Sequence, residues 1–77
     1  MTIRVYVDFN TMAKDRERRI YINTYLHEEL VDTLRPGLPV ILYDETLEVE
    51  AVAEFDEEYR EWVGRPDWST AHDLPYP

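Results

Sequence analysis

Residues 47–55 alternate between apolar and mostly acidic side chains, and this pattern constrains the fold more than any other part of the sequence. The apolar positions are Leu47, Val49, Ala51, Ala53 and Phe55, and the intervening ones are Glu48, Glu50, Val52 and Glu54. Successive side chains of a strand point to opposite faces, so the pattern predicts a β-strand with one apolar and one nearly all-acidic face. Such a strand covers a core on one side only, which favours an antiparallel sheet.

Three further segments have strand patterns. Residues 3–9 and 20–25 alternate, and residues 40–43 form a short apolar run. The first two segments are predicted to pair as an antiparallel hairpin across an exposed, polar connection at residues 10–19. Residues 40–43 and 47–55 are predicted to form a second hairpin through the turn at residues 44–46.

Residues 26–34 change period. Leu26, Leu30, Val31 and Leu34 share one helical face, which predicts a short helix. Thr24 is a candidate N-cap, and residues 35–37 (Arg-Pro-Gly) would end the helix.

Residues 57–63 fit either a helix or a strand. The helix would run from Asp56 as N-cap to Gly64 as C-terminal glycine. The strand is preferred because the long strand at residues 47–55 needs a partner on each side. Residues 56–58 would then be the loop between the two strands.

The predicted order is strand, strand, short helix, strand, strand, strand, which indicates a mainly β protein with a minor α component. A five-stranded antiparallel sheet of this size tends to close or curl, because closure hides unpaired strand edges. We therefore expect a small barrel of SH3-like or OB-like type, or a strongly curled sheet. Residues 1–70 form the predicted domain, and residues 71–77 a partly mobile, extended tail.

Composition narrows the functional classes. The 77 residues include no cysteine, and 17 acidic against 8 basic residues give a net charge of −9. A small secreted domain usually carries disulfides, so the chain is predicted to be cytoplasmic. No segment has the length of a membrane span. The acidic balance argues against general nucleic-acid binding, since phosphate contacts need lysine and arginine.

The acidic strand face is the first candidate binding site. Glu48, Glu50 and Glu54 lie on it. It could dock a basic protein partner, or mimic nucleic-acid phosphates and so inhibit a DNA- or RNA-binding protein. The structural alternative, which we favour, is a solvated outer face.

The basic residues of the first connection are the second candidate. They are Lys14, Arg16, Arg18 and Arg19. They could bind an anion or RNA, with nearby tyrosines as stacking faces. Asp15 and Glu17 are interleaved with them, which favours an ordinary soluble loop. A basic loop and an acidic strand on one chain also allow weak self-association.

The aromatic residues near the C-terminal end are the third candidate. Tyr59, Trp62, Trp68 and Tyr76 either form a recognition patch or complete the core. Tryptophan and tyrosine dominate binding hot spots, but a small core also needs their bulk. Tyr6, Tyr21 and Tyr43 would form a second surface if the fold brings them together.

No pattern predicts catalysis or a cofactor. His27 and His72 lie far apart, and His27 belongs to no His-Glu-x-x-His sequence because position 31 is valine. Two glycines cannot build a phosphate-binding loop, and the single serine, Ser69, lies in no nucleophile elbow. The sequence therefore predicts a non-enzymatic protein–protein interaction module or accessory protein without metal or cofactor, and leaves its partner unassigned.

Overall fold

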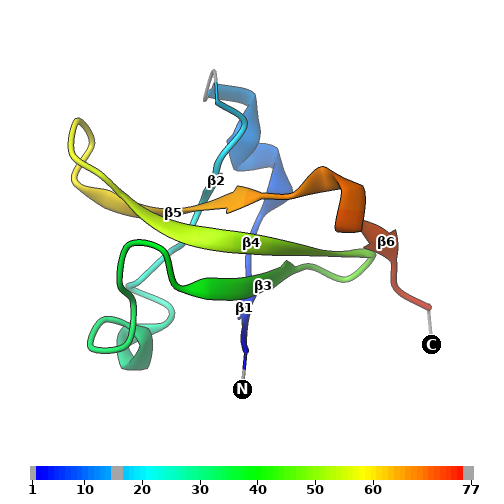
Figure 1. Cartoon of the computed structure of the whole chain (residues 1–77), viewed down its shortest axis with the longest axis horizontal. Coiled ribbons are helices and arrows are strands. Elements are labelled where there is room, and N and C mark those ends of the chain that lie inside the picture. The colour runs from blue at the N-terminus through cyan, green and yellow to red at the C-terminus, as the bar shows by residue number, and fades with distance from the viewer. Residues whose placement is uncertain (1, 15–16, 76–77) are drawn as a thin grey trace.

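A computed structural model describes residues 2–14 and 17–75, with the backbone alone for residues 12–14 (Figure 1). Within these residues the chain forms one mixed six-stranded sheet. The strands are β1 (Ile3–Tyr6), β2 (Ile20–Tyr21), β3 (Pro39–Tyr43), β4 (Leu47–Asp56), β5 (Glu61–Pro66) and β6 (His72–Asp73). Three short 3-10 helices accompany them: η1 (Phe9–Lys14), η2 (Glu28–Leu30) and η3 (Trp68–Thr70). The strand order is β1-β3-β4-β5-β2, and β6 pairs with β4.

The antiparallel meander β3–β4–β5 is the centre of the sheet, and the predicted hairpin of residues 40–43 and 47–55 is confirmed. Its first turn contains no glycine. Asp44 Oδ1 instead accepts hydrogen bonds from the backbone N–H groups of Thr46 at 2.8 Å and Leu47 at 2.9 Å. A short carboxylate that binds the backbone two and three residues ahead stabilises such a turn.

The preferred strand at residues 57–63 is confirmed in part, because β5 starts at Glu61. Residues 57–60 form the turn that joins β4 to β5. Asp56, the helix N-cap of the alternative, accepts a hydrogen bond from the backbone N–H of Tyr59 at 2.9 Å and so caps this turn. Gly64 lies inside β5 and ends no helix.

The predicted hairpin between the first two strands is wrong. β1 pairs with β3 in parallel, and β2 pairs with β5 at the other end of the sheet. The connection at residues 10–19 includes η1, which begins where the Asp8 carbonyl oxygen accepts hydrogen bonds from the N–H and the hydroxyl of Thr11. A connection of this length and shape can take the chain from one end of the sheet to the other, whereas a hairpin needs only a tight turn.

The predicted helix at residues 26–34 is also wrong, since only η2 and adjacent turns form there. Asn23 Oδ1 accepts hydrogen bonds from the N–H groups of Tyr25 and Leu26, which makes a local turn at the expected helix start. Leu30 and Leu34 are buried, but Leu26 and Val31 are exposed. A segment this short cannot offset helix nucleation without a full apolar face.

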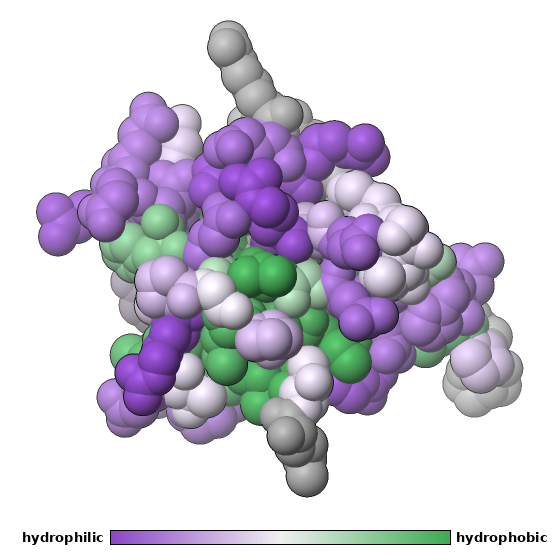
Figure 2. Space-filling view, in the orientation of Figure 1, coloured by the Kyte–Doolittle hydropathy of each residue, from purple (hydrophilic) through white to green (hydrophobic). Residues whose placement is uncertain are grey.

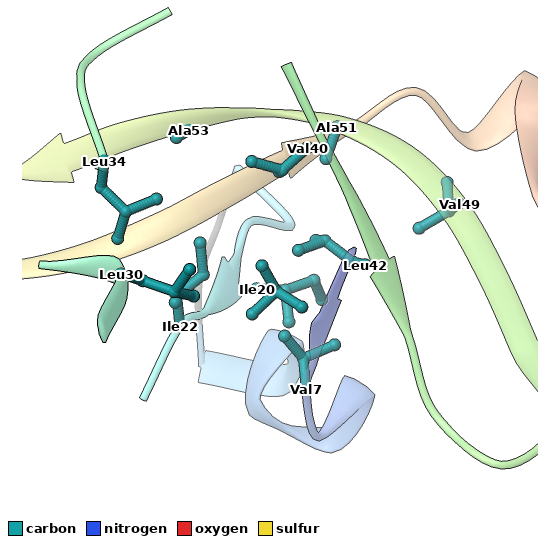
Figure 3. Packing of buried hydrophobic residues seen from close by; sticks show 11 residues of the cluster. Val7, Ile20, Ile22, Leu30, Leu34, Val40, Leu42, Val49, Ala51 and Ala53 are labelled. Atoms are coloured by element: carbon teal, nitrogen blue, oxygen red, sulfur yellow. The ribbon is translucent and has the colours of Figure 1, made fainter. Parts of the chain in front are cut away.

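The core lies inside the curve of the sheet. Its buried side chains come from both ends of the strand order and meet in one cluster (Figure 3). The cluster comprises Val5, Val7, Ile20, Ile22, Leu30, Leu34, Val40, Leu42, Val49, Ala51 and Ala53. Because β1 and β2 are opposite ends of the sheet yet cover the same cluster, the sheet must be strongly curled. In Figure 2 hydrophobic residues gather near the middle of the visible face and hydrophilic residues surround them.

The β-dominant fold class is therefore confirmed. Among the described strands the hydrogen-bonded path does not close, and the SH3-like or OB-like barrel stays a prediction. β6 falls within the predicted tail and pairs with Leu47 and Glu48, while Tyr76 and Pro77 lie outside the described residues. No helix in the described part of the chain is long and apolar enough to cross a membrane.

Candidate functional site

An open groove of about 380 Å³ lies between the β4–β5 turn and the segment that follows β2. Figure 1 shows these two parts of the chain on the same side of the molecule. The groove is lined by Tyr21, Thr24, Tyr25, Val31, Phe55, Tyr59, Arg60, Glu61 and Trp62. Five of these nine residues are aromatic, and we refer to the site as the aromatic groove.

Phe55 and Trp62 connect the aromatic groove to the core. They are register partners on β4 and β5, and their rings meet edge to face with centroids 5.3 Å apart. Trp62 is partly buried and also packs against the core cluster. Trp62 therefore belongs both to the core and to the surface, which were separate alternatives in the sequence. Anchoring by the core holds one side of the groove in place.

Tyr25 and Tyr59 stand on the two opposing segments and are largely exposed. Their relative exposures are 85% and 69%, and Val31 and Leu26 nearby in the sequence are also exposed. Single exposed apolar residues are ordinary in proteins, whereas several gathered at one concave site indicate binding. These side chains lack the contacts that bury the hydrophobic residues of the core.

The two segments that border the aromatic groove are rich in acidic residues, and Glu61 is the single acidic residue among those that line it. The segment with Val31 carries Glu28, Glu29 and Asp32, the β4–β5 turn carries Glu57 and Glu58, and Glu61 begins β5. Arg60 is the single basic residue among those lining the groove. Burial, the Glu61 carboxylate and Tyr25 raise the pKa of Tyr21 above its usual value. That influence places Tyr21, Tyr25 and Glu61 in one electrostatic environment.

The three glutamates predicted on the outer face of β4 do not form a uniform acidic surface. Glu48 pairs with Arg4 at 3.1 Å, and Glu54 pairs with Arg65 at 2.5 Å. Glu50 is exposed. Two of the three charges are thus balanced within the molecule. A phosphate mimic needs open charges, so this placement gives the nucleic-acid mimic less support than the sequence did.

An ion-pair network covers the outer side of β4 and β5. Arg19 lies 2.6 Å from Asp56 Oδ2 and 3.5 Å from Glu54 Oε1, with only 13% of its side chain exposed. Arg65 contacts Glu54 and also Glu17, at 3.0 Å. The network therefore ties residues 17–19 to β4 and β5, and through Asp56 to the turn that carries Tyr59.

The carboxylates of this network have lowered pKa values. The hydrogen bond from Arg65 is the main cause for Glu54, and the backbone hydrogen bond from Tyr59 is the main cause for Asp56. Both pKa values are depressed in the folded state, so the unfolded chain binds more protons at mildly acidic pH. By linkage, the two groups stabilise the fold above their unfolded-state pKa values, and this contribution is lost as pH falls through the folded ones.

We expect the free energy of unfolding to fall as pH is lowered from about 5.5 to below 4, because Glu54 and Asp56 have ordinary pKa values of 4.5 and 3.8. Urea unfolding between pH 7 and pH 3 measures this slope. The double variant Glu54→Gln/Asp56→Asn should be less stable at pH 7 and have a flatter profile. An equally steep profile in the variant would show that other groups cause the dependence.

The predicted anion-binding side chains that the structure describes do not come together at one site. Arg19 joins the ion-pair network, while the Arg18 guanidinium lies 5.4 Å from the centre of the Trp68 ring. Arg16 and the side chain of Lys14 lie outside the described residues. The two described arginines thus contact different parts of the fold, and anion or RNA binding stays a prediction.

The predicted aromatic cluster divides. Tyr59 and Trp62 line the aromatic groove, but Trp68 packs elsewhere, against Phe9 with ring centroids 6.3 Å apart. Of the second predicted surface, Tyr6 and Tyr43 do meet edge to face at 5.6 Å. Tyr21 instead lies on β2 at the groove, at the other end of the strand order.

Tyr6 and Tyr43 are held by charged neighbours. The Tyr6 hydroxyl donates a hydrogen bond to Glu45, which is the main cause that raises the pKa of Tyr6 to about 12. The Arg4 guanidinium lies over the Tyr43 ring at 4.2 Å while it binds Glu48. The charged and polar groups around Tyr6 and Tyr43 therefore bind one another within the protein.

The two histidines have separate local contacts. His27 Nε2 lies 3.1 Å from the Tyr6 carbonyl oxygen, and His72 Nδ1 lies 3.2 Å from the Thr70 carbonyl oxygen. Among the described residues, no group of three or more histidine and acidic side chains could hold a metal ion.

Sequence reasoning missed Tyr21, Tyr25 and Phe55 as members of the aromatic groove. Tyr25 falls in a segment read as a strand followed by a helix, so no face could be assigned to it. The pairing of β2 with β5 brings Tyr21 beside the groove, and that pairing is long-range. One signal in the sequence could have identified the groove. Two separate segments both contain tyrosines together with acidic residues.

Comparison with other proteins adds no assignment to this geometry. No protein-family model matches the chain, and no curated protein or solved structure is significantly similar to it.

Proposed function

We propose that the chain is a small protein-binding module whose aromatic groove holds a basic segment of a partner polypeptide. The supporting observation is the gathering of aromatic side chains, with Tyr25 and Tyr59 largely exposed, in one groove that acidic segments border. Tyrosine and tryptophan contribute a large share of binding energy at protein interfaces. They provide contact area with few rotatable bonds, so that little side-chain entropy is lost on binding.

Charge complementarity selects a basic occupant. Residues 28–32 and 57–61, which border the groove, carry six acidic residues, Glu28, Glu29, Asp32, Glu57, Glu58 and Glu61, and one basic residue, Arg60. The whole chain has a net charge of −9, which adds a long-range attraction for a positive partner. Such attraction raises association rates and rejects acidic competitors.

The shape of the groove supports binding rather than chemistry. It is open to solvent, and Tyr25 and Tyr59 remain largely exposed at its sides. Catalytic sites gain from excluding water around the reacting groups. An open groove lined by aromatic side chains is instead suited to the reversible binding of an extended segment.

A displayed library of random peptides tests this proposal. Selection against the wild-type protein should enrich basic sequences, and Tyr25→Ala and Tyr59→Ala should each weaken the selected peptides by about tenfold, or 1.4 kcal/mol. Calorimetric titration measures the affinities. Tyr6→Ala is the matched control, since Tyr6 is an exposed tyrosine on another strand, and it should leave binding unchanged.

Thermal unfolding of Tyr25→Ala and Tyr59→Ala should remain close to wild type, because the two side chains are mostly exposed. Enrichment of acidic sequences, no enrichment at all, or equal binding to both variants would overturn the proposal.

A further inference from the structure

The geometry points to the guanidinium of a partner's arginine as the group that occupies the aromatic groove, an inference that rests on the proposed function. Guanidinium groups stack on aromatic faces and also bind carboxylates through a planar set of donors. The groove offers both kinds of partner within one site of about 380 Å³. This volume exceeds that of one side chain, so the neighbouring backbone of the partner can enter as well.

The aromatic residues come from the segment that follows β2, from the β4–β5 turn and from β2, β4 and β5 themselves. Phe55 and Trp62 form an edge-to-face pair, Trp62 packs against the core cluster, and Tyr25 and Tyr59 line the groove from two segments that are distant in the sequence. A cation placed near the centroid of such a ring is attracted by the negative charge of the ring face. Tryptophan gives the strongest attraction of the aromatic side chains.

Glu61 supplies the charged acceptor. It lies at the first position of β5 and lines the groove. The ion pairs among the described residues involve other carboxylates, namely Glu17, Glu29, Glu48, Glu54 and Asp56. Glu61 also raises the pKa of Tyr21, which shows that its charge acts inside the groove. The carboxylate and the rings are thus presented together to an incoming cation.

The same arrangement already exists within the molecule. The Arg4 guanidinium lies 4.2 Å from the centre of the Tyr43 ring and 3.1 Å from a carboxylate oxygen of Glu48. There the chain supplies all three members, namely cation, ring and carboxylate. In the aromatic groove it supplies rings and a carboxylate, and the partner would supply the cation.

Arginine fits this site better than lysine. A guanidinium is planar and weakly hydrated, so it can lie flat against a ring and donate two hydrogen bonds to Glu61 at once. A lysine ammonium is compact and strongly hydrated, and loses more solvation when it enters the groove. We therefore expect arginine peptides to bind more tightly than lysine peptides of the same sequence.

Arg60 provides a test of whether the groove binds a cation or an anion. It lines the groove and repels a cationic guest, but it would attract an anionic one. Its φ of 56° lies in the left-handed region, where glycine is accommodated more easily than arginine. Arg60→Gly therefore removes the charge without demanding a new backbone conformation, and the variant should fold.

The experiment is a titration of the ¹⁵N-labelled protein with acetyl-Gly-Arg-Gly-amide at low salt, followed by nuclear magnetic resonance. The indole N–H of Trp62 should shift on binding. Trp68 packs against Phe9 away from the groove, so its indole signal should stay in place and serve as the internal control. The matched peptides carry lysine or glutamine in place of arginine, and the glutamine peptide should leave Trp62 unshifted.

Two variants then set the sign of the charge effect. Glu61→Gln should weaken the arginine peptide by about two- to fivefold, and Arg60→Gly should tighten it by about the same factor. Both effects should shrink at high salt, because the charges are exposed. A static Trp62 signal, equal binding of the glutamine peptide, or weaker binding to Arg60→Gly would overturn the inference.

The two proposals fail in distinguishable ways. If library peptides bind through Tyr25 and Tyr59 but the arginine peptide does not move Trp62, the protein-binding proposal stands and the arginine assignment falls. If Tyr25→Ala and Tyr59→Ala leave library peptides unaffected, the groove is not the binding site and both fall.

Discussion

Replacing Gly64 with valine is expected to lower the free energy of unfolding by about 2–3 kcal/mol, through overpacking of the core. Gly64 is buried in β5, and a Cβ atom at this position would lie 2.7 Å from Leu42 Cδ1 and 3.2 Å from Leu42 Cδ2. Leu42 is fully buried, so its methyl groups would have to move within the packed core. The valine side chain would therefore force Leu42 or the strands themselves to shift. Chemical denaturation at neutral pH measures the loss.

Strand propensity and core packing predict opposite effects of Gly64→Val on stability. Valine has a higher strand propensity than glycine, so propensity alone would make Gly64→Val stabilising. Gly64→Ala should fall between wild type and valine, since it adds one carbon atom at the short contact. A valine variant as stable as wild type would show that the core around Leu42 yields more easily than its burial indicates.

Leu42→Ala should cost about 3–4 kcal/mol, because it removes a fully buried side chain and leaves a cavity. Leu42 lies on β3 and Gly64 on β5, and the Leu42 side chain packs directly against Gly64. The cavity would open toward Gly64, whose missing side chain now provides the space for Leu42.

The double variant Leu42→Ala/Gly64→Val should consequently be more stable than the sum of the two single changes predicts. Valine at position 64 fills part of the space that leucine leaves, so a coupling of about 1–2 kcal/mol is expected in the double-mutant cycle. Ile20→Ala combined with Gly64→Val is the control for a core loss elsewhere, because the side chain that a Cβ atom at position 64 would meet most closely is that of Leu42 and not that of Ile20. Strict additivity for the Leu42 pair would contradict the proposed contact.

The sequence predicted those elements whose pattern is local and periodic. The alternation at residues 47–55 predicted β4, and the strand patterns on either side of Asp44 predicted the turn there. The pairing of β1 could not be predicted in this way. Alternation shows which side chains share a face, but not which strand lies alongside, and a long connection leaves several partners open. Short pairings such as β6 leave too few residues for any period to show.

The helix prediction failed for a related reason. Four apolar residues at helical spacing satisfy a pattern, but only Leu30 and Leu34 find core contacts. The other two, Leu26 and Val31, are exposed near the aromatic groove, and Val31 lines it. The mismatch between local pattern and tertiary burial therefore marks the part of the chain to which we assign binding, as expected where function competes with folding.

The candidate site was predicted by residue type more than by place. Tyr59 and Trp62 were identified from their chemistry and do line the groove, whereas Trp68 of the same group supports η1 and η3. Separating the two tryptophans required the sheet register, which sets Trp62 opposite Phe55. The acidic strand looked uniform because the partners Arg4, Arg19 and Arg65 are distant in the sequence.

The parallel pairing of β1 with β3 also separates the order of synthesis from the order of folding. Each pair from Ile3↔Val40 to Tyr6↔Tyr43 joins residues 37 positions apart. The β3–β4–β5 meander has short loops and low contact order, so it can form early once it has been made. β1 is synthesised before β3 and has no neighbouring strand in the sheet until β3 has been made. Until then its unpaired edge is open to aggregation, and a chaperone that recognises extended apolar segments would find its target there.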